Sequence, residues 1–66
     1  MSVSDLDIFR SAKVLINRHG GSAAYYAAGR ADDMLDRGQV DGAKVWRRIT
    51  KAIEALLALD PTGAIN

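Results

Sequence analysis

Apolar side chains recur every three or four residues along most of the chain, which is the spacing of one face of an α-helix. Glycines interrupt this spacing at Gly20–Gly21 and between Gly38 and Gly42, and Pro61 ends it. No segment alternates strictly between apolar and polar residues, as a half-buried strand would. The pattern therefore predicts an all-α protein with three helices, at residues 5–18, 23–36 and 42–59.

The first predicted helix, residues 5–18, has signals at both ends. Ser4 can cap its N-terminus, and the sequence Arg18-His19-Gly20 is a typical stop, since glycine readily adopts a left-handed conformation. At 100° per residue, five apolar side chains gather within an arc of about 120°. They are Ile8, Phe9, Ala12, Leu15 and Ile16, whereas Val14 falls outside the arc.

The second predicted helix, residues 23–36, has a face made mostly of alanine. Ser22 is its expected N-cap and Gly38 its expected C-cap. Such small side chains allow a neighbouring helix to approach closely. Tyr25 is expected beside this face, and Tyr26 is expected to point away from it into solvent. The predicted apolar residues are Ala24, Ala27, Ala28, Ala31, Met34 and Leu35.

The third predicted helix, residues 42–59 with Asp41 as N-cap, has the broadest apolar face. A face of this width must contact two neighbouring helices. We therefore expect a small antiparallel three-helix bundle formed by residues 1–60, followed by a flexible tail at 61–66. The face has two rows: Val45, Ile49, Ala52, Leu56 and Leu59, then Trp46, Ile53 and Leu57.

The length and composition restrict what such a domain can do. A chain of 66 residues buries only about 60% of its unfolded surface, so either efficient packing or a partner chain must stabilise it. There is no cysteine, and the single histidine, His19, has no recognisable nucleophile or metal-ligand set around it. We expect no enzyme activity, no cofactor and no metal site.

Charge and hydropathy indicate a cytoplasmic protein. Nine Lys and Arg residues nearly balance eight Asp and Glu residues, a weaker bias than in most nucleic-acid-binding domains. No apolar run approaches the length of a membrane span, and the first ten residues lack the features of a secretory signal.

Four basic residues form a stripe on the third predicted helix, opposite its apolar face: Lys44, Arg47, Arg48 and Lys51. This stripe has two interpretations. It can be the recognition surface of a nucleic-acid-binding regulator, or a solvated face. The second interpretation is favoured because the stripe contains no Asn or Gln to read adenine edges. Three nearby aspartates would also repel phosphates.

Those aspartates, Asp32, Asp33 and Asp36, are most simply a solvated acidic surface. They could begin a divalent-cation site only if more oxygen ligands were present. A further alternative is that they meet the basic stripe of a second copy of the chain.

Tyr26 and Arg30, four residues apart, are candidates for a protein-binding patch because Tyr and Arg are common hot-spot residues. The simpler alternative is an ordinary amphipathic helix edge. The leading hypothesis is a non-enzymatic protein-interaction module, self-associating as a homodimer or binding another protein, and the alternative is a nucleic-acid-binding regulator. The expected partner-binding residues are Tyr26, Arg30, Arg47, Arg48 and Lys51.

Three short motifs also resemble a family of small helical proteins of alphaproteobacteria, a domain of unknown function. They are RHG at Arg18–Gly20, RAD at Arg30–Asp32, and GQVDGAKVWRRITKAIEAL at Gly38–Leu56. The resemblance implies a compact cytoplasmic bacterial protein. It brings no catalytic or binding residues with it.

Overall fold

The structure is a computed structural model that describes residues 3–59. Within this range the chain forms α1 (Asp5–His19), a short 3-10 turn η1 (Gly20–Ser22), α2 (Ala23–Asp36) and α3 (Val40–Leu59), and no strand. The all-α prediction is confirmed for this part of the chain. The predicted tail at 61–66 lies outside the described residues.

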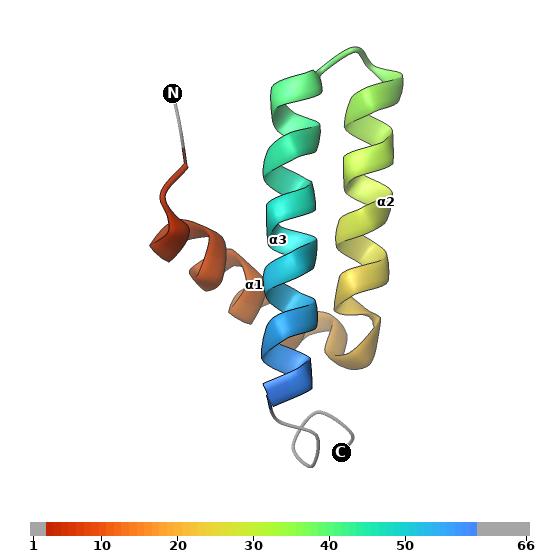
Figure 1. Ribbon diagram of the computed structural model, residues 1–66. Coiled ribbons are helices and arrows are strands. Elements are labelled where there is room, and N and C mark those ends of the chain that lie inside the picture. The colour runs from red at the N-terminus through yellow and green to blue at the C-terminus, as the bar shows by residue number, and fades with distance from the viewer. Residues whose placement is uncertain (1–2, 60–66) are drawn as a thin grey trace.

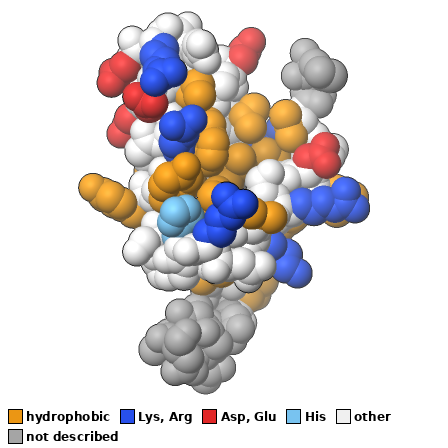
Figure 2. All heavy atoms as spheres, turned by 180° about the vertical axis from the view of Figure 1, so that it is seen from behind, with side chains coloured by type: hydrophobic (Ala, Val, Ile, Leu, Met, Phe, Trp, Pro, Cys, Tyr) orange, Lys and Arg blue, Asp and Glu red, His pale blue; other side chains and the backbone are white. Residues whose placement is uncertain are grey.

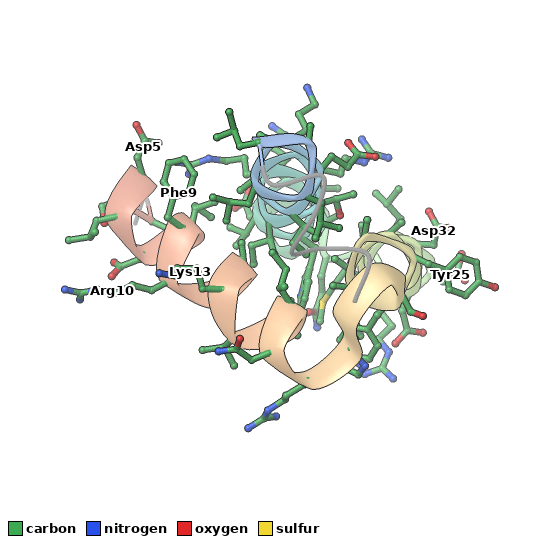
Figure 3. The ribbon with its side chains drawn as sticks, turned by 90° about the horizontal axis from the view of Figure 1, so that it is seen from below. Asp5, Phe9, Arg10, Lys13, Tyr25 and Asp32 are labelled. Carbon is green, nitrogen blue, oxygen red and sulfur yellow. The ribbon has the colours of Figure 1, made fainter. Side chains whose placement is uncertain are left out.

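The helices do not form the predicted antiparallel three-helix bundle. Figure 1 shows α2 and α3 side by side as an antiparallel hairpin, with α1 lying obliquely across α3. In Figure 3, which looks along the hairpin, α2 and α3 appear end-on while α1 extends across the view. Because η1 joins α1 to α2 without leaving helical structure, residues 5–36 are better described as one long bent helix.

The joint at Gly20–Gly21 differs from the separate helix ends that the sequence predicted. Ser22, the expected N-cap of the second helix, has φ −89° and ψ −1° and makes no side-chain capping hydrogen bond. Gly20 instead has φ 57° and donates its N–H to the carbonyl oxygen of Ile16. The two glycines therefore bend a continuous helical path and do not form a loop between separate helices.

The other helix ends agree only in part with the predictions. Ser4 does cap α1, because its hydroxyl accepts a hydrogen bond of 3.2 Å from the backbone N–H of Asp7. Asp41 is not the N-cap of α3, because the helix starts at Val40 and Ala43 donates its N–H to Gln39. Asp41 lies in the first turn, where its charge still favours the helix dipole.

Gly38 turns the chain between α2 and α3. Its φ is 77°, its N–H donates to Leu35, and the N–H of Gln39 donates to Met34. This pair of hydrogen bonds is the Schellman motif, in which a left-handed residue satisfies the last carbonyls of a helix. The short turn explains why α2 and α3 are held together along their lengths.

The core between the helices is built mainly from small side chains. Six of the nine buried apolar residues of the described chain are alanines, so only three isoleucines supply bulk. Ala23 is buried whereas Ala28 and Leu35 are exposed, so the apolar face of α2 is rotated from the predicted one. The buried residues are Ile8, Ala12, Ala23, Ala27, Ala31, Ala43, Ile49, Ala52 and Ile53.

Two glycines of similar exposure are expected to respond oppositely to alanine. Gly29→Ala should raise the free energy of unfolding by about 0.5–1 kcal/mol, because Gly29 is mid-helix and the new methyl meets nothing within 4 Å. Gly38→Ala should lower it by about 1–2 kcal/mol, because an L-residue is strained at φ 77°. Urea unfolding followed by circular dichroism measures both. Equal effects of the two variants would contradict the turn geometry.

Candidate protein-interaction surface

Arg48, one of the predicted partner-binding residues, is already engaged within the chain. Its guanidinium donates hydrogen bonds of 2.8 Å to the carbonyl oxygen of Val3 and to the Asp5 carboxylate. These contacts fix the start of α1 to the middle of α3, across more than forty residues of sequence. Arg48 therefore has a structural role that its place in the basic stripe did not indicate.

Arg47 and Lys51 lie on the other side of α3, facing α2. Both are exposed and line a shallow groove of about 250 Å³ between the two helices. Asp32 and Glu54 line the same groove, so its charge is mixed. The predicted basic stripe is thus divided, with Arg48 turned toward α1 and the pair Arg47 and Lys51 turned toward an acidic neighbour.

Tyr26, which was expected to point into solvent, packs in a cluster of aromatic rings. Its ring stacks on His19 with the centroids 4.3 Å apart and 17° between the planes, and its edge meets Trp46 at 6.2 Å. Tyr25 is the more exposed tyrosine, at 86% against 39% for Tyr26. Tyr26 is thus exposed as expected, but less than Tyr25, because the burial of Ala23 rotates α2 from its predicted orientation.

Arg30 also joins this cluster. Its guanidinium carbon lies 5.6 Å from the centre of the Trp46 ring, which is a cation–π contact. The Asp33 carboxylate forms ion pairs with the guanidinium groups of Arg30, at 3.8 Å, and Arg37, at 3.5 Å. The Nε atom of Arg30 is buried without a hydrogen-bond partner, which is a cost of holding the guanidinium against the indole.

Trp46 connects the ring cluster to an open apolar groove between α1 and α3. The groove has a volume of about 350 Å³, and Arg10 is the one charged residue among those of the described chain that line it. Figure 2 shows apolar side chains gathered near the centre of the face seen there, with Lys, Arg and His side chains beside them. The lining residues are Arg10, Ser11, Val14, Leu15, Trp46 and Ile49, named here the α1–α3 groove.

Sequence reasoning missed most of the α1–α3 groove. Val14 was the one apolar residue outside the predicted arc of the first helix, and Arg10 is four residues before it on the same side. The position of Val14 was the sign in the sequence that α1 has a second apolar surface. The contribution of α3 had no such signal, since only the crossing of α1 brings Trp46 and Ile49 to these residues.

The outer side of α2 carries a different kind of surface. Figure 3 shows Tyr25 and Asp32 projecting from α2 away from α1, whereas Arg10 projects from the far side of α1. Leu35 and Asp36 are also exposed, and at 100° per residue they fall beside Tyr25 and Asp32. These four residues, Tyr25, Asp32, Leu35 and Asp36, are named here the outer α2 face.

Other kinds of site have little support in residues 3–59. The acidic residues and His19 nowhere gather there into a group of three or more that could hold a metal ion. None of the helices in that range combines the length and the apolar character needed to cross a membrane.

Comparison of the chain with protein-family models, with curated proteins and with solved structures gives no match. The resemblance to the alphaproteobacterial family therefore rests on its three short motifs alone.

Proposed function

We propose that the chain is a non-enzymatic protein-interaction module that self-associates, with the outer α2 face of one copy docking on the α1–α3 groove of another. The complementarity of these two surfaces is the main support. One is an apolar groove with Arg10 at its edge, and the other combines Tyr25 and Leu35 with two exposed aspartates. A cytoplasmic setting in a bacterium is part of the same proposal.

The composition of the surfaces favours binding through them. Trp, Tyr and Arg carry most of the binding energy in protein interfaces, and Trp46 and Arg10 lie in the groove. Tyr25 has 86% of its surface exposed, so the monomer leaves a large and mostly apolar side chain in water. Two of the residues expected at an interface, Tyr26 and Arg30, contact Trp46, which lines the groove.

The small core gives self-association an energetic reason. With alanine at most buried positions, the folded monomer removes little apolar surface from water for each ordered residue. A contact that forms only between folded chains stabilises the fold by mass action. Covering Tyr25 and the groove would therefore add to the stability of a marginal domain.

The geometry of this contact determines the kind of assembly. Figure 3 places Tyr25 and Arg10 at opposite sides of the molecule, so one copy presents the groove to one neighbour and the outer α2 face to another. Such head-to-tail contacts give a ring where the rotation closes and a chain where it does not. We expect a mass that rises with concentration beyond that of a dimer, because surfaces on opposite sides of the molecule cannot both be covered by a single second copy.

Charge reversal tests this contact. Arg10→Asp and Asp36→Arg should each weaken association by about tenfold, because like charges then face each other across the interface. An equimolar mixture of the two variants should associate again, and sedimentation velocity at several concentrations measures it. Lys13→Asp is the matched control, since Lys13 is exposed on α1 outside the groove. A mass independent of concentration for the unmodified chain would refute the self-association.

Nucleic-acid binding is the second candidate. Lys44, Arg47 and Lys51 are exposed on α3, but Arg48 is bound to Asp5, and Asp32 and Glu54 adjoin the remaining cations. This candidate requires binding to a labelled duplex or single strand that weakens steeply with salt and is lost in the variant Arg47→Glu with Lys51→Glu. Absence of binding at low salt would eliminate it.

A further inference from the structure

We infer that α1 can leave its own α3 and pack on the α3 of a second copy, giving a closed domain-swapped dimer through the joint at η1. This goes beyond the docking proposed above and does not depend on it. The swapped dimer uses the contacts of α1 that already exist in the monomer. The docked assembly uses surfaces that the monomer leaves exposed.

The first support is the distribution of contacts made by α1. It packs mainly on α3 and much less on α2, although α2 follows it directly in sequence. The bond between Asp5 and Arg48, at 2.8 Å, belongs to the same α1–α3 contact. All of these interactions can form between two chains with unchanged geometry, as domain swapping requires.

The second support is the backbone of the joint. His19 at φ −116° and ψ −10° and Ser22 at φ −89° and ψ −1° stay in the right-handed helical region. Gly20, with φ 57°, is the residue of the joint with a positive φ. Rotation of both dihedral angles of Gly20, from φ 57° and ψ −131° to helical values near −63° and −42°, would straighten α1 and α2 into one continuous helix.

The third support is that packing around the joint is open. A methyl group added at Gly20 or at Gly21 meets no heavy atom within 4 Å. Side chains introduced at these two positions therefore fit beside the bent joint without a steric clash. A side chain added there would act through its backbone preference and not through a clash.

The stack of His19 on Tyr26 holds the bent form. These residues are seven positions apart, and in a straight helix that separation corresponds to about 10.5 Å along the axis. Their ring centroids lie 4.3 Å apart, so the stack exists only when the joint is bent. The stack and the entropy of remaining a single chain favour the monomer, whereas a straight joint favours the dimer.

The decisive experiment changes only the handedness of residue 20, using chemically synthesised chains. Gly20→Ala should raise the dimerisation constant by roughly a hundredfold or more, because each dimer releases two strained L-residues from a positive φ. D-alanine at the same position prefers the bent backbone and should leave association at the level of the unmodified chain, since φ 57° and ψ −131° mirror a favourable L-conformation. Gly21→Ala is the matched control, because Gly21 does not have a positive φ.

A second measurement identifies which helix is exchanged. In the Gly20→Ala chain, Asp5→Arg and Arg48→Asp each place like charges together within one subunit. In a swapped heterodimer of these two variants, the introduced arginine of one chain meets the introduced aspartate of the other. The native Asp5 and Arg48 also meet across the chains, so both ion pairs form between subunits. Native mass spectrometry of the mixture should show the heterodimer in excess over either homodimer.

Defined results would overturn the inference. A Gly20→Ala chain that stays monomeric at all concentrations, folded or unfolded, excludes the swap, because the dimer should relieve the strain. A dimer that forms equally with either enantiomer excludes the joint as its cause. Failure of the docking proposal is seen separately, since Arg10→Asp leaves the swapped contact intact.

Discussion

Replacing Ile53 with alanine is expected to lower the free energy of unfolding by about 2–5 kcal/mol. Ile53 is the largest side chain that is fully buried in the described part of the chain, with 0% of its surface exposed. The loss combines the transfer free energy of the removed carbons with the cavity left behind. Most of the buried residues in its cluster are alanines, whose side chains are too short to fill that cavity.

Urea unfolding followed by circular dichroism measures this effect, and the transition of Ile53→Ala should shift strongly or disappear. Leu59→Ala is the matched control, because Leu59 lies in the same helix with 80% of its surface exposed. Its effect should stay within about 0.5 kcal/mol. Equal destabilisation by the two substitutions would contradict the place of Ile53 in the core.

Enlarging Ala27 to leucine is expected to lower the free energy of unfolding by about 1–3 kcal/mol. Ala27 has 0% of its surface exposed and belongs to the core cluster, on the helix that packs most extensively against α3. Three extra carbons there must force the two helices apart or push side chains out of their preferred rotamers. The short turn at Gly38 limits how far the helices can separate.

The next residue provides the comparison. Ala28→Leu adds the same atoms at an exposed position and should change the free energy of unfolding by no more than about 0.5 kcal/mol. Thermal unfolding of both variants at one protein concentration makes the comparison direct. If Ala28→Leu were the more damaging change, the buried face of α2 would be the one predicted from sequence.

The periodicity of the sequence was enough to predict the all-α character and the buried rows of α1 and α3, but not the joining of α1 and α2 into one bent helix. Ile8 and Ala12 in α1 and Ile49, Ala52 and Ile53 in α3 are buried as expected. The prediction is correct for these two helices because large apolar side chains identify the buried face of a helix clearly. In α2 the alanines occur on several sides, so hydrophobicity alone did not fix which of them face the core.

The joint and the interaction surface could not be predicted for a different reason. A pair of glycines is compatible with a loop, a cap or a bent helix, and tertiary packing decides among them. The bond of Arg48 to Asp5 and the groove that Trp46 and Val14 line together bring in residues far apart in sequence. They depend on the crossing direction of α1, for which a single sequence has no local signal.

The place of Trp46 gives the chain a built-in optical probe. It is the only tryptophan, and its indole adjoins the Tyr26 ring, the Arg30 cation and the α1–α3 groove. Its fluorescence therefore responds both to changes in the α1–α3 groove and to changes in the ring cluster with Tyr26. A covered groove would remove water from the indole, whereas a straightened joint would move His19 off Tyr26 while the groove stays open. Emission wavelength and quenching can thus separate the two events in the unmodified chain, without an attached dye.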